Sequence, residues 1–176
     1  MQRQILRQEL IGIGVIAGVG SVMHFAFEWS GELPVIGVFA AVNESVWEHL
    51  KLTYWPTLLY AAIEYHKLRD LTQNCIAAKT ASLYIMPAVI AGLYYAYVNA
   101  TGSDSLIFDI ATFVIAIAVG QLVSARIMAR PRYHQAVFVL AIIGMVTLGV
   151  LYGVFTFRTP QLPIFREGST GIYGIP

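Results

Sequence analysis

The sequence predicts an all-α fold, a helical transmembrane bundle of five spans with a short re-entrant or interfacial segment before the second span. Two observations predict this class. Of 176 residues, 57% are hydrophobic and 12% are charged, whereas an ordinary soluble domain carries about 25% charged residues. The apolar residues also cluster into runs of roughly 20, the length that a helix needs to cross a bilayer. The lipid bilayer is therefore the expected environment.

Composition also excludes several classes of function. The formal net charge of +1 argues against a nucleic-acid partner, which calls for a basic domain. The single cysteine, Cys75, excludes an intramolecular disulfide and a cysteine-based metal site. No small-residue cleavage pattern follows the first apolar run, so we expect this run to be retained as a span.

The first span is predicted over residues 10–27. It contains a small-xxx-small pair, Gly14 and Gly18, which allows two helices to approach closely in lipid. Packing within the chain is the first interpretation, and a homo-oligomer seam is the alternative. Gly149 and Gly153 form a second such pair near the end of the chain.

The second span is predicted to begin at Asn43, acting as an N-cap, and to end near His66, with a kink at Pro56. The preceding residues, 35–42, are apolar but too few to cross a bilayer. We expect them to form the re-entrant or interfacial segment, which must be covered by protein or face a watery cavity.

The other spans are apolar runs separated by polar loops. Residues 1–157 are expected to form one transmembrane domain, followed by a Pro- and Gly-rich tail, 158–176, that is extracytoplasmic and a candidate lid. The predicted third, fourth and fifth spans cover 80–98, 106–125 and 135–157.

The lysines and arginines predict the orientation. Placing the N-terminus and the loops 66–79 and 126–132 on one side collects eight of the eleven basic residues there. The N-terminus is therefore predicted to be cytoplasmic and the C-terminus extracytoplasmic. The acidic residues then concentrate on the outer side; they are Glu28, Glu32, Glu44, Glu48, Asp104, Asp109 and Glu167.

Side chains of the metal-ligand type recur at helical spacing on this outer side. His24 and Glu28 are four residues apart and share a helix face, and Glu44 and Glu48 do the same. His49 is rotated by about 100° from Glu48. Imidazoles and carboxylates in this pattern suit a divalent metal, Zn, Fe or Mn. The alternatives are an ion-pair network that fixes helix packing, and side chains solvated at headgroup level.

Asp109 comes after Asp104 by about one and a half helical turns, so we expect it inside the bilayer, where an ionisable group indicates function. It or Glu44 is the candidate general base. The predicted metal ligands are His24, Glu28, Glu48 and His49, and further predicted cavity residues are Asn43, Trp47, Lys51 and Tyr54.

Three stretches together resemble a known family. They are His24–Gly31, the Asn-Glu-Ser-x-Trp-Glu-His motif at 43–49, and the Thr-Gly-x-Tyr-Gly-Ile tail at 170–175, with Asp109 between them. The pattern is similar to that of small prokaryotic multi-span membrane proteins of unknown function. The resemblance implies a multi-pass protein of a prokaryotic plasma membrane, but no activity, substrate or cofactor.

The residues favour a metal-dependent, membrane-embedded hydrolase with an outward-facing polar cavity and a lipid-like or small amphiphilic substrate. One alternative is a transporter or channel for a small solute or cation, because broken helices beside polar residues are typical of transporters. The other is a structural subunit of a membrane complex.

Overall fold

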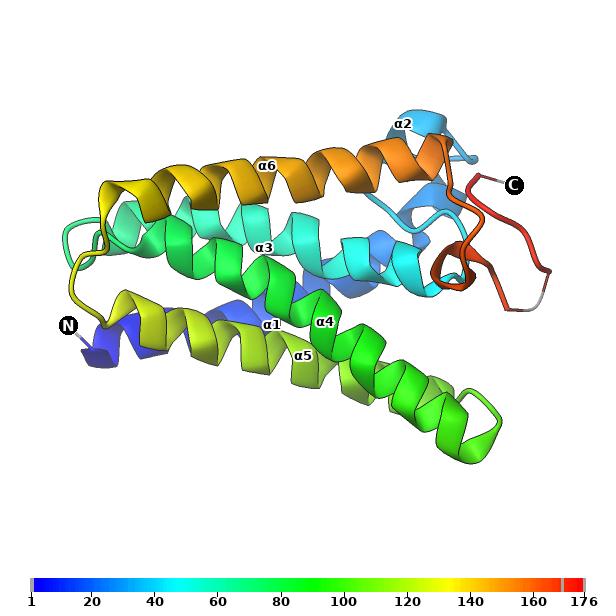
Figure 1. Ribbon diagram of the computed structural model, residues 1–176, viewed down its shortest axis with the longest axis horizontal. Helices are drawn as coiled ribbons and strands as arrows, with labels where there is room; N and C mark the ends of the chain where they lie inside the picture. The colour runs from blue at the N-terminus through cyan, green and yellow to red at the C-terminus, as the bar shows by residue number, and fades with distance from the viewer. Residues whose placement is uncertain (1, 169, 176) are drawn as a thin grey trace.

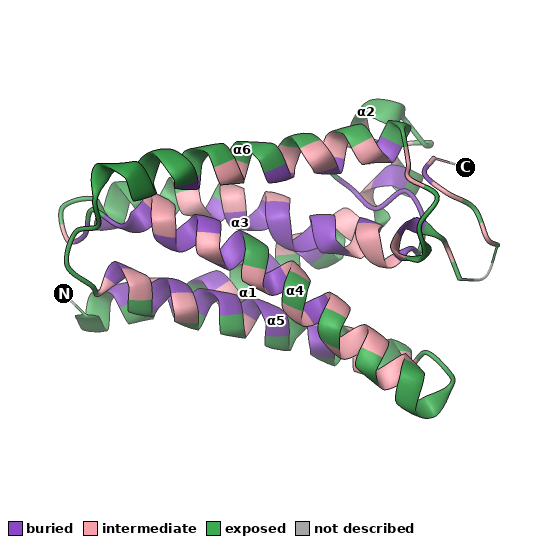
Figure 2. Cartoon of the chain, in the orientation of Figure 1, coloured by how far each residue is buried: buried purple, intermediate pink, exposed green. Residues whose placement is uncertain are grey.

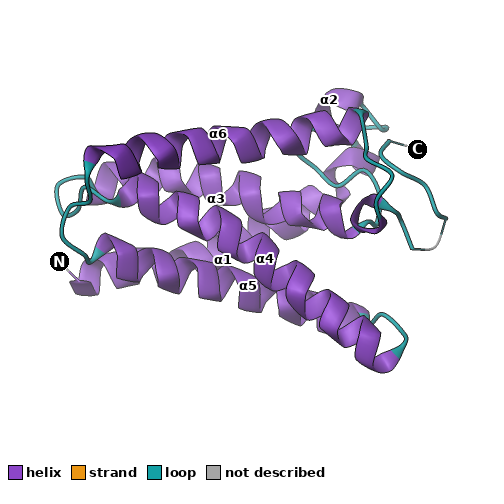
Figure 3. Ribbon diagram, viewed as in Figure 1, coloured by secondary structure: helices purple, strands orange, loops and turns teal. Residues whose placement is uncertain are grey.

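The computed structural model describes residues 2–168 and 170–175 and confirms the all-α class (Figures 1 and 3). Successive long helices run in alternating directions along one bundle. Among the described residues no strand occurs, only an isolated antiparallel bridge between Arg166 and Tyr173. The elements are α1 (Gln2–Trp29), α2 (Pro34–Gly37), α3 (Val46–Leu68), α4 (Cys75–Thr101), α5 (Leu106–Met128), α6 (Gln135–Phe157) and the 3-10 turn η1 (Pro163–Phe165).

Four helices, α1, α4, α5 and α6, are long and apolar enough to cross a membrane, with mean hydropathy from 1.5 to 2.5 in their best windows. Their outward faces are apolar, as the largely exposed α6 shows (Figure 2). Leu140 on α6 is 67% exposed and Ile107 on α5 is 82% exposed. Such surfaces are unfavourable in water and suit lipid, so the helices indicate a membrane protein.

The helix α3 is as long as α5 and α6 but is not among these four. It packs against α1 and α4 and buries three charged side chains, those of Glu48, Lys51 and Glu64. A helix surrounded by other helices can carry charge because its partners are protein atoms rather than lipid. That α3 is a fifth span stays a prediction.

The start of α3 differs from the prediction. The helix begins at Val46, and its N-cap is Ser45, whose hydroxyl accepts a hydrogen bond from the Glu48 amide at 3.4 Å. Asn43 does not cap the helix, because its side-chain oxygen accepts from the Ser45 amide at 2.9 Å and its amide nitrogen donates to the Gly174 carbonyl at 2.7 Å. The polar side chain expected to start the helix instead binds the tail.

Between α2 and α3 the backbone is irregular, and side chains of α3 satisfy it. The Val38 carbonyl accepts from Trp55 Nε1 at 3.0 Å, and the Val42 amide donates to Glu48 Oε2 at 3.0 Å. Buried irregular backbone is stable only when its polar groups have such partners. The helix α2 has only four residues, and a re-entrant position for this segment stays a prediction.

The two glycine pairs have different surroundings. A Cβ added at Gly149 would lie 2.5 Å from the Tyr54 hydroxyl oxygen, so this glycine permits close packing within the chain. A Cβ at Gly14 or Gly18 would meet no atom within 4 Å. Of the two predicted seams, only the one on α1 presents an open glycine face, and association there stays a prediction.

A buried ion cluster, called the closed cluster below, joins α1, α3, α4 and α5. Lys79 Nζ lies 2.7 Å from Glu9 Oε2 and 2.5 Å from Glu64 Oε2, and Ser124 Oγ donates to Glu9 Oε1 at 2.5 Å. Gln121 Oε1 accepts from Lys79 Nζ at 3.4 Å. Lys79 was expected in a loop but lies inside α4, and its side chain is 3% exposed. The closed cluster consists of Glu9, Glu64, Lys79, Gln121 and Ser124.

Candidate metal centre

A cavity of about 730 Å³ lies at the end of the bundle where α3 begins and the tail folds back. Its polar wall includes His24 from α1, Glu44 from the segment before α3, His49 from α3, and Asp109 from α5. Its apolar wall includes Ile90, Val98 and Leu106 from α4 and the start of α5. The tail contributes Gly168 to the lining.

Three ligand-type atoms form a compact triangle in this cavity. His24 Nε2 lies 3.1 Å from His49 Nε2, and Glu44 Oε2 lies 3.6 Å and 3.3 Å from these two nitrogens. Zinc–ligand bonds of about 2.0–2.1 Å in a tetrahedron place neighbouring ligand atoms about 3.3 Å apart. The three observed separations bracket this value, so a single ion fits between the three atoms.

A backbone hydrogen bond orients His49 for this arrangement. Its Nδ1 lies 2.9 Å from the Ser45 carbonyl oxygen, which can only accept, so Nδ1 carries the proton. In the neutral ring the lone pair is then on Nε2, which faces His24 and Glu44. Metal-bound histidines in proteins are oriented in the same way by a second hydrogen bond.

The electrostatics of the triangle call for a positive charge at its centre. Two imidazole nitrogens 3.1 Å apart repel each other if both present lone pairs, and the nearby carboxylate adds to that repulsion. When Nε2 of these rings carries a proton instead, the hydrogen bonds from His24, and less strongly from His49, hold the pKa of the Glu44 carboxyl well below its usual range. The protein therefore stabilises the anionic ligand and leaves a place for a proton or a metal cation.

The structure separates the other two predicted ligands from the triangle. Glu28 is exposed on α1 and is not part of the ligand group. Glu48 Oε2 pairs with Lys51 Nζ at 2.5 Å, and the same ammonium donates to the Gly37 carbonyl at 2.7 Å and to Thr156 Oγ1 at 2.9 Å. Glu48 and Lys51 thus hold the segment before α3, while His49, on another face of the helix, reaches the cavity.

The four further predicted cavity residues are not among those that line it. Asn43 holds the tail, and Tyr54 donates to the Met145 carbonyl at 2.8 Å in the core. Trp47 packs on Phe165 of the tail, with ring centroids 4.7 Å apart. Lys51 is paired with Glu48.

Thr112 and Tyr94 are among the cavity residues that the sequence did not indicate. Thr112 lies one helical turn beyond Asp109 on α5, is 2% exposed and lines the cavity, and its hydroxyl has no hydrogen-bond partner among the described residues. Tyr94 lines the cavity from α4. The i, i+3 spacing from Asp109 is the signal that could have indicated Thr112.

Residues 2–175 match the pattern of a family of unknown function (DUF6512). The chain belongs to the DUF6512 family. No curated protein and no solved structure matches it. In this DUF6512 protein the family match includes the tail up to Ile175, so the segment that Asn43 holds is part of the family's pattern.

Proposed function

We propose that this DUF6512 protein is a metal-dependent hydrolase embedded in the membrane, with His24, Glu44 and His49 as ligands of one divalent ion. The observation that carries the proposal is the triangle of ligand atoms, 3.1–3.6 Å apart, at tetrahedral spacing. Three protein ligands with a fourth position open to a cavity are typical of catalytic rather than structural zinc sites. Zinc suits the mixed imidazole and carboxylate set, with iron or manganese as alternatives.

Asp109 supplies the base in this proposal. It lines the same cavity, and its carboxylate interacts electrostatically with His49. A bound ion lowers the pKa of its water to about 7. Asp109 would accept the proton of the water that attacks an ester, amide or phosphoester centre. It would return that proton to the leaving oxygen or nitrogen as the scissile bond breaks.

The walls of the cavity favour a lipid-like or small amphiphilic substrate. Ile90, Val98 and Leu106 add apolar surface to the cavity that also contains the polar triangle. A molecule with an apolar chain and a polar, hydrolysable group matches both walls. With the basic loops on the cytoplasmic side and α3 as a fifth span, the cavity opens toward the extracytoplasmic leaflet.

Metal content tests the proposal directly. The protein is purified in detergent without chelators, and its metals are measured by mass spectrometry for wild type, His24→Ala, His49→Ala and Glu28→Gln. We expect about one transition-metal ion per chain in wild type and in Glu28→Gln, because Glu28 lies outside the triangle. We expect its loss in both histidine variants. Metal-free wild type, or equal metal in all four proteins, would contradict the site.

Hydrolysis is tested on the same preparations with a panel of ester- and amide-linked lipids, followed by mass spectrometry of the products. We expect Asp109→Asn to keep the metal and to lose most of the turnover. Bound metal without hydrolysis of any lipid in the panel would support the metal site and contradict the hydrolase function.

A carrier function is the second candidate, and the closed cluster favours it. Glu9, Glu64 and Lys79 gather ionisable groups near the other end of the same bundle, and chains of such groups occur in transporters. Flux of cations into proteoliposomes by the wild-type protein, together with no hydrolysis of any lipid in the panel, would support transport over hydrolysis.

A further inference from the structure

A second concave site lies at the opposite end of the bundle. This end contains the N-terminus, the α3–α4 loop and the α5–α6 loop. It is a pocket of about 440 Å³ between these two loops. Three arginines, Arg69, Arg130 and Arg132, line it together with one acid, Asp70. The lining therefore carries three positive charges and one negative charge, a net charge of +2.

A single buried side chain holds both loops that form this arginine pocket. Asn74 is 2% exposed, and its amide nitrogen donates to the carbonyls of Arg130 at 3.0 Å and Pro131 at 2.9 Å. Its oxygen accepts from the Tyr133 amide at 3.0 Å. The backbone that carries Arg130 and Arg132 is thus fastened to the start of α4, so the pocket is a built feature rather than a chance fold of two loops.

No ion pair among the described residues neutralises the arginines of the pocket. Within 2–168 and 170–175, no carboxylate forms an ion pair with Arg69, Arg130 or Arg132. A guanidinium remains charged at all physiological pH values, so like charges held around one concavity repel each other. An anion in the pocket would relieve that repulsion.

We propose that the arginine pocket binds a phosphate group, that of an anionic phospholipid headgroup or of a soluble phosphate ester. The guanidinium fork matches two phosphate oxygens at once, which makes arginine the preferred partner of phosphate. The volume is within the range of small-molecule sites. The pocket lies where the apolar helices end, at headgroup level in a bilayer, and basic pockets between transmembrane helices are known to take anionic headgroups.

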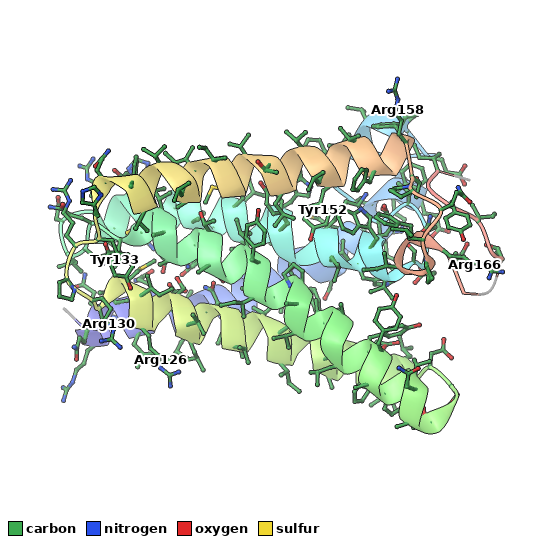
Figure 4. All side chains as sticks on the ribbon, viewed as in Figure 1. Arg126, Arg130, Tyr133, Tyr152, Arg158 and Arg166 are labelled. Atoms are coloured by element: carbon green, nitrogen blue, oxygen red, sulfur yellow. The ribbon has the colours of Figure 1, made fainter. Side chains whose placement is uncertain are left out.

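The general excess of basic residues at this end does not account for the pocket. That excess requires only that arginines lie on one side, as Arg3, Arg7 and Arg126 do. Figure 4 shows Arg126 pointing outward from α5, whereas Arg130 lies at the loop. The clustering of three arginines around one concavity, on a backbone fastened by Asn74, is the additional observation.

The test compares two triple variants that remove equal charge from the same end. One is Arg69→Gln, Arg130→Gln, Arg132→Gln, and the control is Arg3→Gln, Arg7→Gln, Arg126→Gln. Each protein is incubated in neutral detergent with phosphatidylglycerol or with phosphatidylcholine, and the retained lipid is measured by native mass spectrometry. Phosphatidylcholine is the control lipid because its choline group neutralises the charge of its phosphate. A separate arm titrates inorganic phosphate by calorimetry.

We expect wild type and the control triple to retain phosphatidylglycerol over phosphatidylcholine, and the pocket triple to bind it at least tenfold more weakly. Arg130→Lys, which keeps the charge but loses the fork, should weaken binding severalfold without affecting the fold. Phosphate binding with the same variant dependence but no retained lipid would assign the site to a soluble ester. Equal losses in both triples, or no binding of either probe to wild type, would overturn the proposal.

Discussion

The closed cluster and the histidine–glutamate triangle use the same kinds of ionisable side chain and differ in whether those side chains satisfy one another. In the closed cluster, Lys79 supplies the cation for Glu9 and Glu64, and all three side chains are at most 3% exposed. In the triangle no lysine or arginine of the described residues pairs with Glu44, and the side chains of His24, His49 and Glu44 are 26%, 32% and 60% exposed. A buried cluster that contains its own cation can hold helices together, whereas a group of ligand atoms without such a cation beside a cavity is available for a ligand.

The largest expected effect is on the free energy of unfolding, and it distinguishes the closed cluster from the triangle. Lys79→Met would leave two carboxylates buried without their cation, and breaking a buried pair in this way costs about 3–5 kcal/mol. We expect the free energy of unfolding in detergent to fall by that amount, while metal content per folded chain stays at the wild-type value. The control is Lys67→Met, which removes an exposed lysine from the end of α3. Equal stability of the two variants would show that the closed cluster does not hold the helices together.

The converse substitution is Glu44→Gln in the triangle. The amide keeps the shape but loses the negative charge, so we expect zinc affinity to fall by about 100-fold, or about 2.7 kcal/mol. Because the side chain is 60% exposed, the unfolding free energy should change by less than about 0.5 kcal/mol. Competition with a fluorescent zinc chelator measures the affinity. An unchanged affinity would remove Glu44 from the ligand set.

The smallest effect is on the pH dependence of the metal-free protein. Hydrogen bonds from His24 and His49 lower the pKa of Glu44 in the folded state. As the pH falls, the Glu44 carboxylate is therefore protonated at a higher pH in the unfolded chain than in the folded one. The resulting stabilisation is present above the ordinary carboxyl pKa of about 4.3 and is lost as the pH falls through the lowered folded value. Solvent screening keeps this stabilisation below about 0.5 kcal/mol.

The measurement is the difference in unfolding free energy between wild type and Glu44→Gln at pH 5.5 and at about pH 3. Asp109 also lines this cavity, and it is present in both proteins. We expect the advantage of wild type to shrink at the lower pH. A difference that grows with acidity would mean that the imidazoles do not hold the Glu44 carboxylate.

Local patterns were sufficient for the class of the fold and for most helices. The last long helix, α6, covers Gln135–Phe157, as predicted from its apolar run. Helix starts were harder to predict where two capping residues compete. Asn43 and Ser45 are both common N-cap residues, but the Asn43 oxygen accepts from the Ser45 amide and its nitrogen donates to the carbonyl of Gly174, 131 residues away. A contact over that separation leaves no local signal.

The sequence by itself determined that this protein is an apolar helical bundle with its metal-type ligands gathered toward one end, since composition and helical period are local properties. Only the tertiary structure decided that Glu44, rather than Glu28 or Glu48, joins the two histidines. It also paired Glu9 and Glu64 with Lys79, which lies on a third helix. The physical reason is that a buried charge binds whichever counter-charge the packing of other helices brings within reach, and helical spacing does not encode that choice.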